Sequence, residues 1–323
     1  MLLQVLPITG LNIADDSFRM SFAPRLERLT SSIKTIGVVQ PIVARHTVDG
    51  AYQIVAGYRR VVACQALGRQ TIPALVYDHS ALPVFQAFLH NLHDNLATRG
   101  LNLIEEAHVL ERLLGSYGIA EDDLVKTYLP LMEEDASYRV LHQLLSLMQC
   151  AGPAKALIVD KRYALSTAAR IAEFSPSTQE ALVKVLRPLR ATPAKLNDLL
   201  VMIREIAARD AVSVEDVLER YQLLAVVIDP TVAPPAKVEA LRKTLQGVRL
   251  PTLMERQQQF ASMIRDLALP QTAKLTADPY FEDPRIKLEY QFKAPEELAT
   301  LVTQLQQAFD RQSWRKIFEW YRV

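Results

Sequence analysis

The 323 residues exceed the usual size of one hydrophobic core, so we expect two or three domains. Half of the residues are hydrophobic and 23% are charged, which is typical of globular proteins and excludes a fibrous or disordered chain. The 37 basic and 36 acidic side chains nearly cancel, which excludes a global attraction to polyanions. A bound nucleic acid would therefore need a local basic patch.

The two cysteines, Cys64 and Cys150, have no spacing that indicates a zinc site or a disulfide framework, which fits a reducing compartment. No stretch approaches the roughly 18 apolar residues of a membrane span, and the first residues lack the basic region of a signal peptide. We therefore expect a cytoplasmic protein with no membrane partner.

Residues 1–95 read as a mixed α/β head. Its hydrophobic patterns predict strands at 2–8, 41–46, 52–56 and 71–77, and helices at 24–37 and from Gly57 to Gly68. Asp49-Gly50 between the second and third strands is a hairpin signal, and Gly37 is a helix end signal.

From Leu82 onward, apolar residues recur at helical spacing and no strand is predicted up to about Arg209. Residues 227–237 are rich in proline and predict a linker or a turn cluster. Residues 286–292 alternate as a half-buried strand, and a closing helix carries Trp314, Phe318 and Trp320. We predict an α+β fold of three domains: the head (1–95), an all-helical domain (96–210) and a mainly helical C-terminal domain with a short sheet (211–323).

The stretch GYRRVVACQALG (57–68) places a glycine and two arginines between a strand and a helix. Cations in the first helical turn oppose the helix dipole, so Arg59 and Arg60 make physical sense if an anion binds there. Gly57 would let that anion approach the backbone. The alternative is that both arginines are solvated or paired with acids.

Two further segments bear on this site. Gln40 and Pro41 stand at the entrance to the second strand, and Asp94 and Asn95 lie near the end of the first long helix. A carboxylate beside an amide oxygen offers two hard ligands of the kind Mg²⁺ prefers. His90 and His93 precede this pair, but the sequence offers no further strong ligand that would complete a transition-metal site.

The ordered set GVVQPIVAR, VAGYRRVVACQALG and DNLATRGLNLIEEA resembles the three N-terminal boxes of the ParB partition-protein family, whose N-terminal fold is shared with sulfiredoxin. The helices of residues 141–174 also resemble that family's central helix-turn-helix domain. The resemblance covers roughly Leu3 to Val185. It implies a protein that responds to CTP and binds DNA, acting in chromosome or plasmid partition or in gene regulation.

The resemblance also implies the roles of individual residues. Gly57, Arg59 and Arg60 would contact the triphosphate of CTP, with Gln40 and Pro41 nearby, and Asp94 with Asn95 would hold Mg²⁺. In the family, nucleotide binding closes a clamp of two subunits around DNA, so the resemblance implies a homodimer.

The chain departs from the family at several positions. Tyr58 replaces the glutamate of the second box, and Ala97 and Thr98 stand where the third box has glutamine and arginine. These changes predict at most a slow CTPase. Tyr58 also occupies the place of the sulfiredoxin cysteine, so we do not expect that thiol chemistry.

For DNA, the candidate reading helix begins near Ser137, and a basic cluster follows it. The acidic run from Glu133 to Asp135 opposes phosphate binding there. An adaptor or protein-interaction module with little DNA affinity is therefore the alternative function, with a protein partner at the C-terminal domain. The predicted DNA contacts are Ser137, Tyr138, Arg139, His142, Gln143, Lys155, Lys161 and Arg162.

Overall fold

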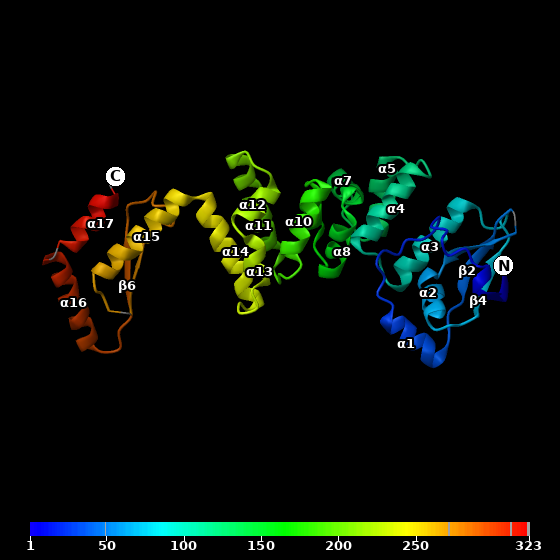
Figure 1. The fold of residues 1–323 in the computed structure, drawn as a ribbon, viewed down its shortest axis with the longest axis horizontal. Helices are drawn as coiled ribbons and strands as arrows, with labels where there is room; N and C mark the ends of the chain where they lie inside the picture. The colour runs from blue at the N-terminus through cyan, green and yellow to red at the C-terminus, as the bar shows by residue number, and fades with distance from the viewer. Residues whose placement is uncertain (49, 271, 311, 322–323) are drawn as a thin grey trace. The chain divides into compact units, whose positions relative to one another are not determined.

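This computed structural model describes residues 1–48, 50–270, 272–310 and 312–321 (Figure 1). The chain divides into two compact units, residues 1–200 and 201–323. A further division near residue 95 stays a prediction. No helix in the described ranges is long and apolar enough to cross a membrane.

A four-stranded sheet forms the N-terminal head, and its strands lie in the order β1-β4-β2-β3. β1 pairs antiparallel with β4, β4 pairs parallel with β2, and β2 pairs antiparallel with β3. The predicted strands are confirmed, while Asp49 of the hairpin signal lies outside the described residues. The bounds are β1 (Leu2–Pro7), β2 (Ile42–His46), β3 (Tyr52–Ala56) and β4 (Thr71–Tyr77).

The core of the head lies between this sheet and two helices. In β4 every second side chain is buried, and these side chains pack with residues of α1 (Glu27–Ile36) and α2 (Tyr58–Ala66). The helix α1 starts three residues later than predicted and ends at Gly37, whose φ of 77° a glycine adopts without strain. The parallel pairing of β2 and β4 requires a crossover, and α2 provides it. A short 3₁₀ turn, η1 (Ile8–Gly10), follows β1, and α3 (Val84–Thr98) packs against β3.

Helices make up the rest of the first unit, as predicted. Asn102 caps α4 (Leu103–Gly115) in a capping box with Glu105, and Ser137 caps α7 (Tyr138–Ser146). α4 packs against α7 and against α8 (Gly152–Lys161). The remaining elements are α5 (Glu121–Asp123), the π-helical η2 (Leu124–Tyr128), α6 (Leu129–Leu131), the 3₁₀ turn η3 (Leu147–Gln149), α9 (Leu165–Ala172), α10 (Pro176–Leu186) and α11 (Pro193–Asp210), whose last turns belong to the second unit.

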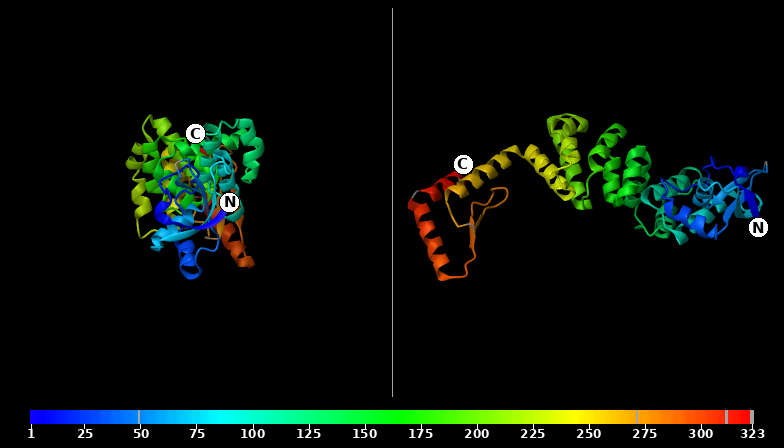
Figure 2. Two further views of the ribbon diagram at one scale, coloured as in Figure 1. Left: turned by 90° about the vertical axis from the view of Figure 1, so that its right-hand side faces the viewer. Right: turned by 60° about the horizontal axis from the view of Figure 1, so that its bottom comes forward.

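The second unit contains the predicted strand, β6 (Lys287–Tyr290), and a partner strand that the sequence analysis missed, β5 (Ala273–Thr276). Phe260, Trp314 and Ile317 pack with β5 residue Leu275 in the core at the orange-to-red end of the ribbon (Figure 2). Within the proline-rich segment 227–237, one helix ends and the next begins. The helices are α12 (Val214–Arg220), α13 (Leu223–Ile228), α14 (Pro234–Arg249), α15 (Pro251–Asp266), α16 (Pro295–Asp310) and α17 (Ser313–Tyr321).

Candidate functional site

Gly57 links β3 to α2 in a conformation that other residues adopt only with strain, with a φ of 94°. A Cβ atom here would lie 2.8 Å from Ile42 Cγ2 and 3.1 Å from Arg60 Nη1. Glycine therefore brings the start of α2 close to both β2 and the Arg60 guanidinium. The first amides of α2 have no partner within the helix, which makes this terminus suitable for an anion.

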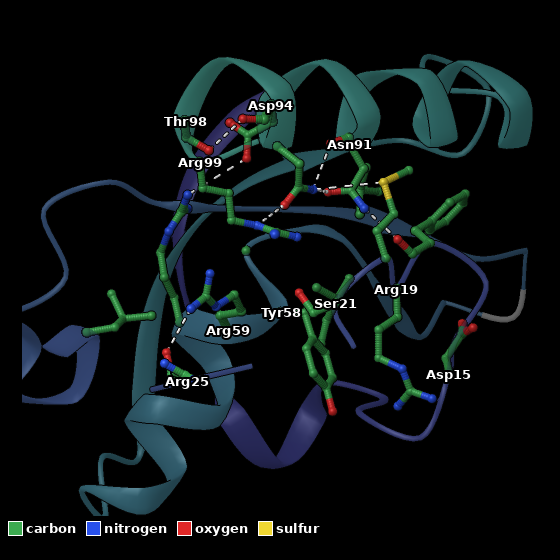
Figure 3. A pocket seen from close by; sticks show the side chains of 18 of the residues that line it. Asp15, Arg19, Ser21, Arg25, Tyr58, Arg59, Asn91, Asp94, Thr98 and Arg99 are labelled. Carbon is green, nitrogen blue, oxygen red and sulfur yellow. Dashed lines mark hydrogen bonds and ion pairs between the residues drawn. The ribbon is translucent and has the colours of Figure 1, made fainter. Parts of the chain in front are cut away.

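A cavity of about 290 Å³ opens at this point, and we call it the Gly57 cavity. Figure 3 shows Asn91, Asp94 and Thr98 of α3 on one side of it and Tyr58 and Arg59 of α2 on the other. Two aspartates, Asp15 and Asp94, line it together with six arginines: Arg19, Arg25, Arg28, Arg59, Arg60 and Arg99. The lining therefore carries an excess of positive charge.

Arg60 is held in place by the segment that enters β2. Its Nη1 atom donates to the main-chain oxygen of Pro41 at 2.7 Å, and its Nη2 atom donates to Gln40 Oε1 at 3.0 Å. Nη2 also lies 3.9 Å from Asp94 Oδ2. Gln40 and Pro41 are not among the residues that line the cavity. They act on it through Arg60, whose guanidinium they orient.

Arg59 reaches across to the loop before α1, where its Nη2 atom donates to the main-chain oxygen of Arg25 at 2.8 Å. Its Nε atom is buried and has no hydrogen-bond partner. Burial lowers the pKa of Arg59, the Arg99 guanidinium lowers it further, and the Glu105 carboxylate opposes both effects. Burial also lowers the pKa of Arg60, against the effect of Asp94. An anion in the cavity would stabilise both charged forms.

The third box places its side chains differently from the family pattern. Thr98 donates to the main-chain oxygen of Asp94 at 2.6 Å, so its hydroxyl serves its own helix. Arg99, one position later, enters the cavity lining and donates from Nε to Asn95 Oδ1 at 2.7 Å. A guanidinium therefore reaches the cavity from position 99 and none from position 98.

A chain of buried polar groups connects Arg99 to the rest of the cavity wall. Arg99 Nη1 donates to Glu105 Oε2 at 2.6 Å, and Phe22 N donates to Glu105 Oε1 at 3.0 Å. Asn95 donates to Asn91 Oδ1 at 2.8 Å, and Asn91 Nδ2 in turn donates to the main-chain oxygen of Phe18. The loop that carries Arg19 is thus fixed at both ends, by α3 and by α4.

Sequence analysis missed Arg19, Arg25, Arg28 and Arg99 as cavity residues. The first three lie in SFRMSFAPRLER (17–28), a segment with three arginines and one acid, and this local excess of positive charge was the available signal. Arg99 was missed because the family pattern points to position 98.

The position of Tyr58 bears on thiol chemistry. Its ring lines the Gly57 cavity, and Arg19 Cζ lies 5.4 Å from the ring centroid. The nearby thiol, Cys64, is fully buried on α2, and burial raises its pKa. A protonated, inaccessible thiol is a poor nucleophile, which agrees with the expectation from Tyr58.

Asp94 and Asn95 fit a metal role unequally. Asp94 lines the cavity and its side chain is 20% exposed, whereas Asn95 Oδ1 already accepts a hydrogen bond from Arg99. Across the described ranges, no three His, Cys, Asp or Glu side chains gather as a metal site would need, so His90 and His93 find no further ligand. Any ion at Asp94 would need further oxygen ligands from a bound phosphate.

The predicted DNA-reading helix is α7, and acidic neighbours occupy part of its surface. The Tyr138 hydroxyl donates to Asp122 Oδ1, and His142 Nε2 lies 3.3 Å from Glu121 Oε2. The Ser137 hydroxyl accepts from Val140 N and caps the helix. Arg139 is exposed and Gln143 is partly exposed.

The basic cluster after α7 is also partly engaged. Lys155 Nζ donates to the main-chain oxygen of Met148 at 2.7 Å, and Lys161 Nζ donates to that of Leu189 at 3.0 Å. Arg162 ends α8 with a φ of 52° and is exposed. Arg139 and Arg162 are therefore the cations of the predicted DNA set that stay most available to phosphates.

The fold and the cavity together define an α/β domain with an arginine-lined cavity at the start of a helix. Residues 2–92 match the family model of the ParB N-terminal domain. This part of the chain is therefore similar to the N-terminal domain of the ParB family.

Curated relatives agree with this assignment. The chromosome-partitioning protein ParB of Myxococcus xanthus is 39% identical over 120 residues, which cover 37% of this chain and 39% of that protein. The nucleoid occlusion protein of Bacillus subtilis is 37% identical over 103 residues, 32% of this chain and 35% of that protein. A probable ParB of Vibrio cholerae is 28% identical and matches 61% of this chain and 64% of its own length. The chain thus spans less than two thirds of each of these relatives.

Two solved structures of Caulobacter crescentus ParB also match. A C-terminally truncated form complexed with CTP-gamma-S is 27% identical, covering 57% of this chain and 98% of its own length, at a TM-score of 0.28. A form complexed to the centromeric parS site is 24% identical, covering 56% and 91%, at a TM-score of 0.34. These scores are low, so the similarity to ParB proteins rests on the sequence matches.

Proposed function

We propose that the chain is a ParB-like, nucleotide-responsive DNA-binding protein whose Gly57 cavity binds the triphosphate of CTP together with Mg²⁺. The observation that carries this proposal is the set of six arginines around the start of α2, opposed by only two aspartates. A magnesium triphosphate remains negative, and guanidinium groups bind phosphate oxygens in pairs. The matched relatives act, by their names, in chromosome partitioning and nucleoid occlusion.

Each cavity residue has a distinct part in this proposal. Arg59 has an unpartnered, buried Nε atom and would donate directly to phosphate oxygens. Arg60 is already oriented by Gln40 and Pro41 and would contribute a fixed positive charge beside Asp94. Asp94 would hold Mg²⁺, which would offset the negative charge of the phosphates, and Asn95 would join it if Arg99 turned toward the phosphates.

Turnover of the nucleotide would be slow or absent. Tyr58 stands where the family has a glutamate, so the cavity lacks that carboxylate beside the arginines. A phenol cannot take up a proton from water at neutral pH as a carboxylate can. The nucleotide would then act as a bound signal in a dimer.

DNA binding is the second half of the proposal. Arg139 and Arg162 are exposed and would contact phosphates, with Ser137, Gln143, Lys155 and Lys161 nearby. Tyr138 and His142 would reach DNA only after leaving Asp122 and Glu121. Partition or gene regulation would be the setting for this activity.

A specific observation favours the alternative function, a protein-interaction adaptor with little DNA affinity. The acidic partners of Tyr138 and His142 lie on the surface that would face DNA, where each negative charge weakens phosphate binding. A partner at the C-terminal unit would fit this alternative.

Two experiments test the proposal. Co-crystals with CTP and Mg²⁺ should show the triphosphate at Gly57, with Arg59 on its oxygens, and a nucleotide bound elsewhere would refute this assignment. Gel-shift assays at low and at physiological salt, with and without CTP, should show DNA binding that weakens with salt and responds to CTP. Absence of binding even at low salt would favour the adaptor.

A further inference from the structure

A second cavity, of about 480 Å³, lies within the first unit and is lined by the loop at Phe22, the start of α4 and the end of α8. We call it the Glu106 cavity. Its volume is in the range of small-molecule sites. Arg25, Arg59 and Arg99 line both cavities, so they form the wall between them. Glu106, Arg162 and Tyr163 line only the second of the two.

Glu106 is the unusual group of this cavity. Glu106 is only 7% exposed. Its Oε2 atom is buried and has no hydrogen-bond partner among the described residues. Burial raises the pKa of Glu106 to about 8, and Glu134 and Glu105 add to this effect. A buried oxygen without a partner is costly, and it indicates a place where a bound molecule could supply the missing hydrogen bond. The last torsion of a glutamate is soft, so this oxygen can rotate toward a partner at low energetic cost.

The charges at the cavity favour an anion. Arg25, Arg59, Arg99 and Arg162 line it, and Glu105 is the negative group that opposes them. Arg25 is paired with Asp160 at 2.6 Å and Arg99 with Glu105. In the described part of the chain, the Arg162 side chain has no recorded hydrogen bond or ion pair. It is therefore the cation most available to a ligand.

Uncharged groups complete the lining. Burial raises the pKa of Tyr163 to about 12, so its phenol stays neutral. Apolar side chains form much of the remaining wall, including those of Phe22, Leu101 and Ile158. A ligand that fits this lining would have an anionic group at one end, an organic body and an uncharged polar group.

We propose that the Glu106 cavity is a second binding site, for a small organic molecule that carries a phosphate or carboxylate group and an uncharged hydrogen-bond acceptor. The anionic group lies at Arg162, and the uncharged acceptor accepts a hydrogen bond from the protonated Glu106 carboxyl group. This site is distinct from the proposed nucleotide site, and the two share three arginines.

The proton on Glu106 gives the site a pH signature. Glu105 on α4 and Glu134 before α7 repel the ionised form of Glu106, and the other ionisable side chains that line the cavity are Arg25, Arg59, Arg99, Arg162 and Tyr163. When Glu106 ionises, it loses its donor proton and repels the anionic ligand. Binding should therefore weaken as the pH rises through about 8.

Calorimetric titrations of the full chain test this proposal, with ribose 5-phosphate, gluconate and uncharged ribose as probes. At about pH 6.5 we expect at least one anionic probe to bind and ribose not to bind, and at about pH 9 we expect roughly tenfold weaker binding. Comparing the affinities for ribose 5-phosphate and gluconate shows whether the site prefers a phosphate or a carboxylate. Glu106→Gln cannot ionise, so this variant should bind the probe at both pH values as the wild type does at the lower pH. Any pH dependence of binding that remains in the variant comes from titration of the probe itself.

Three further variants locate the site. Arg162→Ala and Tyr163→Phe change residues that line the Glu106 cavity but not the Gly57 cavity, and they should weaken binding of the anionic probe. Arg28→Ala changes a residue that lines the Gly57 cavity but not the Glu106 cavity, and it should leave that binding unchanged. Binding of CTP should instead be weakened by Arg28→Ala and left unchanged by Arg162→Ala and Tyr163→Phe. The second site and the nucleotide site can therefore fail or hold separately. Failure of both anionic probes to bind at about 10 mM, or loss of their binding in Arg28→Ala alone, would overturn the second site.

Discussion

Arg99 Nη1 donates to Glu105 Oε2 at 2.6 Å, and this contact joins the Gly57 cavity to the first turn of α4. The Glu105 side chain is only 3% exposed. The same carboxylate accepts from Phe22 N and from Asn102 N, so it holds the cavity loop, the end of α3 and the cap of α4 together. The wall of the cavity therefore depends on a residue outside its lining.

Replacing Glu105 should destabilise the whole first unit. Glu105→Ala would leave Phe22 N and Asn102 N without their acceptor and would remove the ionic partner of Arg99. Breaking such a buried pair costs about 3–5 kcal/mol. Urea unfolding measures this loss. Glu111→Ala, on the same helix but with a side chain that is 51% exposed, should cost less than about 0.5 kcal/mol. Equal effects of the two variants would contradict the central role of Glu105.

Gly57→Ala should harm both folding and ligand binding. The added methyl group would meet Ile42 Cγ2 at 2.8 Å, and the φ of 94° would add strain of about 1–3 kcal/mol. Gly118→Ala is the matched control, because Gly118 also has a positive φ but has open space at its Cβ position. We expect the midpoint of thermal unfolding to fall further for Gly57→Ala, and nucleotide binding to fall in this variant alone. The same loss in both variants would mean that close packing at Gly57 is unimportant.

Stability should depend on pH through Glu106. Its raised pKa means that the folded chain keeps this carboxyl protonated at pH values where the unfolded chain ionises it. The free energy of unfolding should therefore fall as the pH rises from about 4.5 to about 8. Glu106→Gln removes this effect, so its advantage over the wild type should grow by up to about 1.4 kcal/mol per pH unit in that range. Denaturant unfolding at several pH values gives this difference, and an advantage that does not change with pH would argue against a protonated Glu106.

Tyr58→Glu introduces the glutamate that the second box of the ParB family has at this position. If the missing carboxylate limits turnover, this variant should hydrolyse CTP faster than the wild type by about tenfold or more. Tyr58→Phe, which keeps the ring and adds no carboxylate, should match the wild type. Phosphate release measures both rates. An unchanged rate in Tyr58→Glu would mean that turnover is limited elsewhere, for example at Thr98.

Local patterns predicted the head well. The alternation in β4, the glycine at the end of α1 and the strand-glycine-helix order around Gly57 are short-range signals, and the structure has them where the sequence indicates. β5 was missed because four residues are too few to show a period.

The contents of the site were harder to predict, because they depend on contacts between distant segments. No pattern in the sequence shows that Arg25 and Arg99 meet Arg59, or that Asp122 reaches Tyr138. The predicted residues Arg59, Arg60, Asp94 and Asn95 do line one cavity, while Gln40 and Pro41 act on it through Arg60. Which of the predicted DNA residues contact DNA stays a prediction.

The central claim is that the Gly57 cavity binds a nucleoside triphosphate, and a calorimetric titration of the full chain with CTP and Mg²⁺ tests it most directly. We predict one site per chain with a dissociation constant below about 1 mM, weakened at least tenfold by Arg59→Ala. Arg139→Ala, which removes an exposed arginine that does not line the cavity, should leave that affinity unchanged. Absence of heat at millimolar CTP, or an equal affinity in the Arg59→Ala variant, would contradict the claim.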